Sequence, residues 1–482
     1  MDIKHTFPLN IFRAYDIRGK LSNLTPHVIH SIAYALALQY KNAGQDHVVI
    51  GYDARLTSPA YANIIQKIFE QQGLVVINIG CCSSPMMYYI ARDFGGNGIM
   101  VTASHNPKSD NGIKWILNGE PPTPDVIQQV GQLAQVSLPN VQQMIDSDHV
   151  LHQIVPLYCL QYQQSLLDDI QLSRPLKIVL DGLHGSAGRC AKLVLEKLGC
   201  QVIALRCEAN GDFPDHAPDP SHAEHLTDLQ AAILLEKADL GIALDGDGDR
   251  LVLVDEHAHI ISPDRLLSLF AQICLQQHPR KEIVFDVKCS QMVADTVQRL
   301  NGQAKMIRTG SSFLRTYLSQ SKGSAVFGGE YAGHYVFNDG RGFGYDDGLY
   351  AALRVMEYFT HSDTASLSSL LAIYPERYCT EDTYISTHDA NPNQVLNDIE
   401  ILSHRLGARL SKIDGVRLDF DDGFGIIRAS NTGEYFTVRF VSPLIISFVL
   451  SNKLKRVSPS KSDGLLSSQT LKSLTSFIEG EF

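Results

Sequence analysis

The sequence predicts an α/β protein with three similar βαβ-containing mixed-sheet domains and a C-terminal α+β domain. Three observations lead to this prediction: the chain length, an internal repeat, and a change of pattern after about residue 375. The 482 residues are too many for one hydrophobic core, because domains typically contain about 100–150 residues. With 44% hydrophobic and 19% charged residues, the composition is that of an ordinary globular protein.

The internal repeat predicts the first three domains. Each copy starts with a β-branched apolar run that ends in an aspartate, and continues through a short loop, a helical stretch, a glycine and a second strand. The copies span 47–80, 176–205 and 281–307, with aspartates Asp53, Asp181 and Asp286 and glycines Gly73, Gly199 and Gly302. Strand, helix and strand in this order form a βαβ unit with parallel strands. The apolar strands do not alternate, as expected when helices cover both faces of a sheet.

The last part of the chain has a different pattern. Alternating strands predominate after about residue 375, and a polar stretch over 451–467 precedes a last short helix. The expected domains are 1–149, 150–258, 259–374 and 375–482.

Composition excludes several classes of function. A formal net charge of −11 leaves no basic surface for nucleic acid. Nine cysteines without a CxxC pair favour a reducing compartment. Residues 1–19 contain no signal-peptide core, and the apolar run over 440–450 is interrupted and too short to cross a bilayer. We therefore expect a cytoplasmic protein with no membrane partner.

The stretch VTASHNP (101–107) places Ser104 and His105 side by side after a strand-like run. The pair suggests a nucleophile and its base, but side chains of neighbouring residues generally diverge. No GxSxG motif is present either. His105 is therefore not expected to act as the base for Ser104.

The stretch DGDGDR (245–250) alternates three carboxylates with two glycines between apolar runs. Two like charges about 4 Å apart repel by about 4 kcal/mol at an effective dielectric near 20. Three carboxylates in a tight loop therefore require a cation, and oxygen ligands favour Mg²⁺. We expect Asp245, Asp247 and Asp249 to bind one Mg²⁺.

These stretches also admit other interpretations. An EF-hand requires glycine where Arg250 stands, and helices where strands are expected. A phosphatase with Asp245 as nucleophile explains DGDGDR but leaves VTASHNP unexplained, and a solvated acidic turn remains the simplest alternative. DGLHGSAG (181–188) has its glycines spaced GxxGxxG, which does not fit the dinucleotide-binding fingerprint. A serine beside Mg²⁺ and an arginine is, by contrast, suited to carrying a phosphoryl group.

Seven motifs occur in a familiar order. They are IFRAYDIRG (11–19), VTASHNPKSDNGIKW (101–115), LDGDGDR (244–250), DVKCS (286–290), GGEYAGHY (328–335), GFGYDDG (342–348) and RASNT (428–432). By these motifs the sequence closely resembles the α-D-phosphohexomutase family, most of all its bacterial phosphomannomutase/phosphoglucomutase branch. The resemblance covers nearly the whole chain and is weakest over the last forty or so residues.

The resemblance implies four domains around a central cleft, each of which contributes one loop. It implies that Ser104 is a phosphoserine and that Asp245, Asp247 and Asp249 hold Mg²⁺ together with a phosphate oxygen of that serine. The implied reaction interconverts hexose 1-phosphate and hexose 6-phosphate of mannose, glucose or both. A hexose 1,6-bisphosphate serves as intermediate and primer.

The resemblance also implies roles for further residues. Arg250, Arg18 and Lys114 neutralise the phosphoryl group in flight, Lys114 also moves a proton, and His105 contacts phosphate. The residues expected to contact substrate are Tyr15, Lys288, Glu330 and His334 for the sugar, and Arg428, Ser430, Asn431 and Thr432 for the distal phosphate.

Two positions depart from the family pattern. Ala332 stands where the sugar-recognition motif usually has serine, and Ser311 where a Thr-Gly-His motif has histidine. Sugar preference and auxiliary proton transfer are therefore open, and a phosphoglucosamine mutase or a non-catalytic sugar-phosphate-binding homologue remain alternatives. The expected oligomeric state is a monomer or weak dimer.

Overall fold

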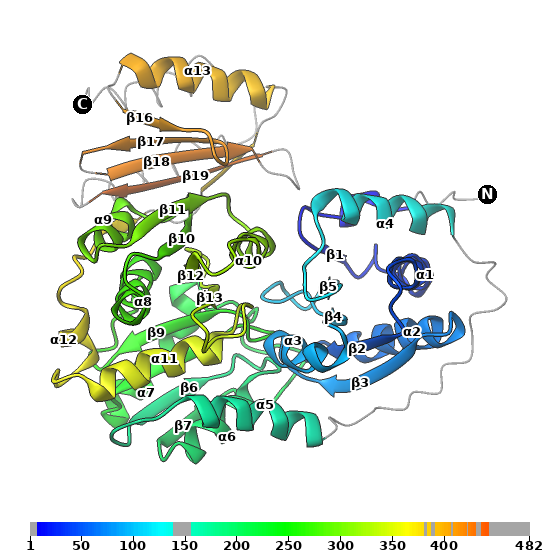
Figure 1. The fold of residues 1–482 in the computed structure, drawn as a ribbon, viewed down its shortest axis with the longest axis horizontal. Helices are drawn as coiled ribbons and strands as arrows, with labels where there is room; N and C mark the ends of the chain where they lie inside the picture. The colour runs from blue at the N-terminus through cyan, green and yellow to red at the C-terminus, as the bar shows by residue number, and fades with distance from the viewer. Residues whose placement is uncertain are drawn as a thin grey trace.

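The structure is a computed structural model that describes residues 7–137, 156–379, 383–386, 391–405, 408–421, 423–429 and 435–442. Its strands form four sheets, one for each of the domains expected from the sequence (Figure 1). The polar stretch at 451–467 and the short helix expected after it lie outside the described residues.

The first unit is a five-stranded sheet in the order β1-β5-β4-β2-β3. Its strands are β1 (Ile17–Lys20), β2 (His47–Tyr52), β3 (Val75–Cys81), β4 (Gly98–Val101) and β5 (Asp110–Ile116). Its helices are α1 (Pro26–Asn42), α2 (Ser58–Gln71), α3 (Ser84–Ala91) and α4 (Pro124–Val136). Thr25, Ser83 and Thr123 cap α1, α3 and α4, because their hydroxyls accept hydrogen bonds from backbone N–H groups of the first turn.

The second and third units each contain a four-stranded sheet. The second comprises α5 (Pro156–Asp169), β6 (Lys177–Asp181), α6 (Gly188–Lys197), β7 (Gln201–Leu205), α7 (Thr227–Glu236), β8 (Leu240–Leu244) and β9 (Leu251–Asp255). The third comprises α8 (Pro263–Gln277), β10 (Glu282–Asp286), α9 (Gln291–Arg299), β11 (Gln303–Ile307), α10 (Ser311–Gln320), β12 (Ala325–Gly329), β13 (Tyr335–Phe337), α11 (Gly348–His361) and α12 (Leu367–Leu371).

The predicted repeat is confirmed in the strand order. The sheets run β3-β2-β4-β5, β7-β6-β8-β9 and β11-β10-β12-β13, and the first carries β1 as an additional edge strand. In each, the first three strands are parallel and the fourth is antiparallel to the third. The three mixed sheets are therefore copies of one architecture.

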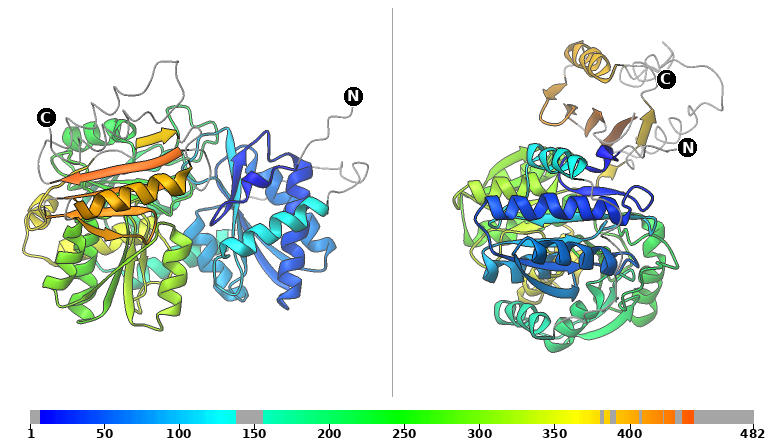
Figure 2. Two further views of the ribbon diagram at one scale, coloured as in Figure 1. Left: turned by 90° about the horizontal axis from the view of Figure 1, so that it is seen from above. Right: turned by 90° about the vertical axis from the view of Figure 1, so that its right-hand side faces the viewer.

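In its described residues, the C-terminal unit is an antiparallel sheet with one helix, as the alternating pattern predicts. It contains β14 (Tyr378–Cys379), β15 (Thr383–Ser386), α13 (Pro392–Arg405), β16 (Arg409–Ser411), β17 (Val416–Phe420), β18 (Gly423–Ala429) and β19 (Tyr435–Ser442). Figure 2 shows this sheet, coloured orange, beside the third unit. Val287 packs there against Phe424 and Ile426, and the Arg417 guanidinium donates to the carbonyl oxygens of Val287 and Cys289.

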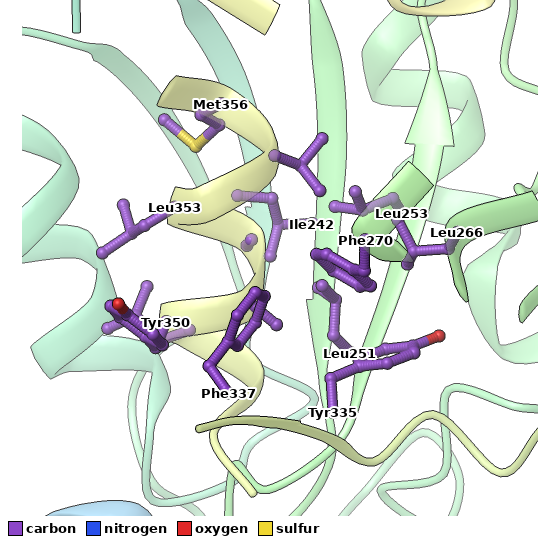
Figure 3. Packing of buried hydrophobic residues seen from close by; sticks show 14 of the residues in the cluster. Ile242, Leu251, Leu253, Leu266, Phe270, Tyr335, Phe337, Tyr350, Leu353 and Met356 are labelled. Carbon is purple, nitrogen blue, oxygen red and sulfur yellow. The ribbon is translucent and has the colours of Figure 1, made fainter. Parts of the chain in front are cut away.

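One hydrophobic cluster joins the first three units. Figure 3 shows the part in which Ile242 and Leu253 of the second unit meet Phe270, Phe337 and Leu353 of the third. The C-terminal sheet has a separate cluster with its own buried residues. No helix in the described part of the chain has the length and apolar character needed to cross a membrane.

Candidate active site

Three polar loops leave the three mixed sheets at the same topological position. They are the serine loop (102–109) between β4 and β5, the aspartate loop (245–250) between β8 and β9, and the glutamate loop (330–334) between β12 and β13. Each loop follows the third strand of its sheet and leads into the antiparallel fourth. Direct contacts between these loops build the site.

Ser104 lies at the contact between the serine and aspartate loops. Its side chain is almost fully buried, at 2% exposure, and its Oγ donates to Asp245 Oδ2 at 2.7 Å. The two residues are 141 positions apart in the sequence. The backbone N–H of Ser104 donates to Thr102 Oγ1 at 2.7 Å, which fixes the turn that presents the hydroxyl.

The expectation that Ser104 and His105 point apart is wrong. Ser104 Oγ lies 3.2 Å from His105 Nδ1, within hydrogen-bond distance. The reason is the left-handed backbone at Ser104, whose φ of +52° turns the two side chains toward the same side. Burial lowers the pKa of His105 well below its usual range, and Arg250 and Arg18 lower it further. The ring is therefore neutral and a weak base despite the contact.

The three aspartates of the aspartate loop are fully buried and converge. Asp245, Asp247 and Asp249 each offer an oxygen within 4.8 Å of the others. Oδ1 of Asp247 has no hydrogen-bond partner among the described residues, and Oδ1 of Asp249 faces only the imidazole of His334. Burial raises the pKa of Asp245 well above its usual range, and the charges of Asp249 and Asp247 add to the effect. Unpaired buried carboxylate oxygens are the donor set that a divalent cation such as Mg²⁺ requires.

Glycines allow the aspartate loop to approach the serine loop. A Cβ atom at Gly246 would lie 2.5 Å from the carbonyl oxygen of Ser104, so a larger residue would push the loops apart. Gly248 has a φ of +76°, which a residue with a side chain adopts only at a cost.

Lys114 of β5 reaches the aspartates from the first unit. Its Nζ lies 2.8 Å from Asp247 Oδ2 and 2.5 Å from Asp249 Oδ2. Burial acts to lower the pKa of Lys114, but Asp247 and Asp249 outweigh it and raise that pKa well above its usual range. Ser84 Oγ, at the start of α3, also donates to Asp247 Oδ2 at 2.5 Å.

Two arginines lie at the edges of this cluster. Arg18 donates from Nε to Asp16 Oδ2 at 2.9 Å and from a terminal nitrogen to Asn106 Oδ1 at 3.0 Å. The backbone N–H of Arg250 donates to Asp245 Oδ1 at 3.2 Å, and its Nε lies 3.3 Å from His334 Nε2. Both guanidinium groups are therefore held next to the serine and aspartate loops.

The glutamate loop joins the cluster through His334. Its Nε2 lies 3.3 Å from Asp249 Oδ1, and its Nδ1 lies 3.0 Å from Glu330 Oε2. Burial acts to lower the pKa of His334, but Asp249 and Glu330 outweigh it and raise that pKa to about 10. Burial acts to raise the pKa of Glu330, but the contact with His334 lowers it. Glu330 also accepts a hydrogen bond from the backbone N–H of Gly310, beside Ser311.

Arg428, Tyr15 and Lys288 are the other predicted residues that the structure describes. Arg428, at the end of β18, is 3.5 Å from Asp414 Oδ2, which also accepts from the backbone N–H of Thr309 at 3.2 Å. Tyr15 is 44% exposed and lies beside Gly310, where a Cβ atom would be 3.6 Å from its ring. Lys288 follows β10 and is half-buried. The predicted Ser430, Asn431 and Thr432 lie outside the described residues.

Comparison with known proteins identifies the family of this chain. Models of the α/β/α domains I, II and III of phosphoglucomutase/phosphomannomutase match residues 9–137, 159–258 and 262–378. The chain belongs to the phosphoglucomutase/phosphomannomutase family. It is thus a phosphohexomutase, an isomerase, and the resemblance seen in the sequence motifs is confirmed.

Relatives of this phosphohexomutase match it over most of their length. A phosphoglucomutase of Neisseria meningitidis serogroup A is 37% identical over 435 residues, which cover 89% of this chain and 92% of the relative. A phosphomannomutase/phosphoglucomutase of Pseudomonas aeruginosa is 34% identical, covering 94% and 97%. The crystal structure of a family protein from Burkholderia thailandensis superposes with a TM-score of 0.80 at 32% identity, covering 95% of this chain and 99% of that one.

Sequence reasoning missed residues of the phosphohexomutase that support the loops. Arg55 is 2% exposed and donates to the carbonyl oxygens of Ser104, Asn106 and Pro107 at 2.6–2.7 Å. Asp53 holds Arg55 Nε at 3.0 Å. The sequence signal that could have identified these supporting residues is the aspartate that ends the first strand of every copy of the repeat. In the third copy, Asp286 likewise accepts from Thr309 Oγ1 and from the backbone N–H of Tyr331.

Proposed function

We propose that this phosphohexomutase interconverts the 1-phosphate and 6-phosphate of mannose, glucose or both through a phosphoserine at Ser104. The observation that carries the proposal is the buried Ser104 hydroxyl, whose Oγ lies 2.7 Å from Asp245 in a cluster of three buried carboxylates. A hydroxyl group between a metal-ion site and several positively charged side chains that are held in place is suited to carrying a phosphoryl group.

The reaction has two transfers. Ser104 gives its phosphoryl group to the free hydroxyl of a hexose phosphate, whose proton passes to a base, and a hexose 1,6-bisphosphate forms. The bisphosphate turns over in the cleft between the domains, and its other phosphoryl group returns to Ser104. An enzyme molecule without phosphate is primed by hexose 1,6-bisphosphate.

The positions of the charged residues support this chemistry. Asp245, Asp247 and Asp249 would hold one Mg²⁺, which when bound supplies positive charge to the phosphoryl oxygens. Arg18 and Arg250 stabilise the charge that spreads over the phosphoryl oxygens during transfer.

Lys114 and His334 are the candidates for moving the hydroxyl proton. Both hold a proton in this structure, so they are set to protonate the departing sugar oxygen in the second transfer and accept a proton in the first only after releasing their own. Lys114 Nζ lies at the same carboxylates as the proposed cation, which places it beside the reacting oxygen. His334 is fixed between Glu330 and Asp249. His105, neutral and 3.2 Å from Ser104 Oγ, contacts the phosphoryl group.

The remaining residues recognise the substrate. Glu330 accepts hydrogen bonds from vicinal sugar hydroxyls, with His334, Tyr15 and Lys288 around it. The distal phosphate is held by Arg428 together with the loop residues Ser430, Asn431 and Thr432. The Asp414 bridge between Arg428 and Thr309 supports a position for this phosphate next to the sugar-binding residues.

The decisive experiment combines mass spectrometry with kinetics. Purified protein incubated with glucose 1,6-bisphosphate is expected to carry one phosphoryl group on the peptide that contains Ser104. Ser104→Ala is expected to abolish interconversion of glucose and mannose phosphates. Ser109→Ala, a change of an exposed serine in the same loop, is the matched control and should retain turnover.

Two results would contradict the proposal. Substantial mutase turnover by Ser104→Ala would exclude the phosphoserine route. Phosphorylation of Asp245 with accumulation of free phosphate would identify a phosphatase instead. Including glucosamine phosphates in the substrate panel separates the phosphoglucosamine mutase alternative.

A further inference from the structure

Asp346 is a buried carboxylate beside the active site for which the proposed function gives no role. It lies between β13 and α11 at 1% exposure, and its backbone pairs with Val336 of β13 in a β-bridge. Its Oδ2 lies 3.9 Å from His334 Nε2, and its Oδ1 lies 3.8 Å from a terminal nitrogen of Arg315 on α10. Both distances suit ion pairs but are too long for hydrogen bonds, and Oδ1 has no hydrogen-bond partner among the described residues. Because nearly all buried polar atoms in native proteins are hydrogen-bonded, this carboxylate is expected to have a role that its present contacts do not fulfil.

Arg315 holds Asp346 at a contact between the first and third units. Its side chain is buried, and its guanidinium carbon lies 4.1 Å from the ring centroid of Tyr88 on α3. The Tyr88 ring in turn lies 5.6 Å from the ring of Tyr345, the neighbour of Asp346. A guanidinium is attracted to the face of an aromatic ring and to a carboxylate, so Tyr88 and Asp346 both favour this place for Arg315. Neighbours from two units therefore fix the Asp346 carboxylate.

The nitrogen that faces Asp346 also faces a proposed metal ligand. His334 Nε2 lies 3.3 Å from Asp249 Oδ1, and Asp249, His334 and Asp346 each offer an atom within 4.8 Å of the others. A divalent cation on Asp249 would share the negative charge of that carboxylate and bring positive charge toward the imidazole. Asp249 would then hold His334 less strongly. Asp346 is a second carboxylate at the same nitrogen, whereas Glu330 contacts the other ring nitrogen.

We propose that Asp346 is a positioning residue that keeps the His334 imidazole in place when Asp249 binds the metal ion. Arg315 keeps the Asp346 carboxylate where His334 can use it. Asp346 acts through His334 and is neither a metal ligand nor a contact of the substrate. This role rests on the proposed function, which assigns the metal ion to the three aspartates and proton transfer to His334.

NMR of the histidine rings tests this role in the full-length protein without substrate. The signal of His334 is identified as the one that His334→Gln removes. In the wild type, this signal should stay as sharp with saturating Mg²⁺ as without it, because Asp346 retains the ring. Asp346→Asn keeps the size of the side chain and removes its charge, so Mg²⁺ should broaden the His334 signal in this variant.

The matched control is Asp347→Asn, which changes the neighbouring buried carboxylate. Asp347 contacts Tyr350 and Tyr162, so its variant should give the wild-type response of the His334 signal to Mg²⁺. If Asp346→Asn does not fold, Asp346→Ser removes the same charge with a smaller side chain and allows the same comparison.

Two results would overturn the role of Asp346. One is a His334 signal that responds to Mg²⁺ in the same way in the wild type and in Asp346→Asn. The other comes from calorimetric titration with Mg²⁺, in which one bound ion is expected for both proteins. Two ions in the wild type and one in Asp346→Asn would make Asp346 a metal ligand instead.

Kinetics separate this role from the proposed function. A positioned proton-transfer group contributes about a hundredfold or more to a rate, so its misplacement should lower kcat by about tenfold in Asp346→Asn and much less in Asp347→Asn. An Asp346→Asn variant with the kcat of the wild type would overturn the role. A wild type without mutase turnover would contradict the proposed function, and the NMR comparison would then decide the role of Asp346 by itself.

Discussion

The buried guanidinium of Arg55 holds the backbone of the serine loop. Its terminal nitrogens donate to the backbone carbonyls of Ser104, Asn106 and Pro107, and its Nε is fixed by Asp53. A lysine can keep the charge but cannot donate in this fork-shaped pattern. The position of the Ser104 hydroxyl therefore depends on a residue that touches no reacting atom.

We expect Arg55→Lys to lower kcat by about tenfold or more, because each lost hydrogen bond is worth about 1 kcal/mol and the loop loses several. Steady-state kinetics with glucose 1-phosphate and urea unfolding measure the effect. The matched control is Arg206→Lys, which weakens the contact with Asp181 in the second copy of the repeat. Its stability should fall comparably while kcat changes little, and equal losses of kcat in both variants would contradict the argument.

A second prediction concerns Ala332 in the glutamate loop, where the family resemblance of the sequence motif implies a serine. Ala332→Ser adds one hydroxyl next to Glu330, and one hydrogen bond contributes about 0.5–1.5 kcal/mol. We expect kcat/KM to rise by about twofold to tenfold for the sugar whose hydroxyl it contacts. Parallel assays with glucose 1-phosphate and mannose 1-phosphate measure the ratio, and an equal change for both would argue against a role in sugar preference.

At the scale of single residues, side-chain chemistry made the cation site predictable. Contacts that depend on the backbone conformation could not be predicted from the sequence. Repulsion among three clustered aspartates predicts a cation, and a phosphoryl carrier nearby, without knowledge of the fold. The contact between Ser104 and His105 depends on a positive φ that the sequence around a non-glycine residue does not reveal. Arg55 depends on contacts to carbonyls about fifty residues away in the chain.

At the scale of single elements, helix α11 has an unusual start. Its N-cap, Asp347, accepts from the backbone N–H of Tyr350 at 2.9 Å and from the hydroxyl of Tyr162 on α5 at 2.8 Å. Burial raises the pKa of Asp347 to about 6. The Asp347 side chain therefore joins the second and third units. Its carboxyl group titrates in a pH range that unfolding experiments can reach.

The free energy of unfolding should depend on pH through Asp347. Because its pKa is higher in the folded protein, its favourable contribution is complete below about pH 4 and is lost as pH rises through about 6, for a total of about 3 kcal/mol. Asp347→Asn keeps an acceptor for the cap but has no charge. Urea unfolding between pH 4.5 and 8 should show that the variant lacks this part of the slope.

The control for the Asp347 experiment is Asp363→Asn, which changes an exposed aspartate just beyond the other end of α11. Its stability should follow the pH dependence of the wild type. If Asp347→Asn also follows the wild type, the buried cap is not the group that titrates.

Elements inside the repeat could be predicted, whereas strand order in the last sheet could not. Each apolar run, loop and helix of the copies follows a pattern that fixes both the element and its parallel neighbour. In the C-terminal sheet, β15 and β14 both pair with β19, far along the chain. Alternation identifies such strands but does not identify their partners, because antiparallel pairing over long loops leaves no local signal.

At the scale of the whole molecule, the second and third units share one hydrophobic core. Leu253 of β9 in the second unit belongs to the same buried cluster as Phe270 and Phe337 of the third, and strand β9 packs beside helix α11 (Figure 3). The C-terminal cluster is separate, and the contacts of that sheet with the third unit include a small cluster of Val287 with Phe424, Ile426 and Val441. The domain limits expected from the sequence remain predictions. A hydrophobic core that spans two units does not mark a boundary between them.

We expect the second and third units to unfold together and the C-terminal unit to unfold in its own step. Phe270→Ala should cost about 3–5 kcal/mol and weaken hydrogen-exchange protection in both β9 and α11. The matched Phe436→Ala should weaken protection in β17–β19 alone. If Phe270→Ala loses hydrogen-exchange protection in the third unit alone, the second and third units do not unfold together.

The placement of the three loops has a consequence for diversification. One scaffold is repeated three times, and each repeat places a different set of polar residues in the short segment after its third strand: Ser104 in the first, three aspartates in the second, and Glu330 and His334 in the third. Under the proposed function, a change of substrate can thus be sought at positions 331–333, in a segment flanked by strands of an intact sheet. Libraries confined to these positions would leave Glu330, His334 and the proposed transfer machinery as they are.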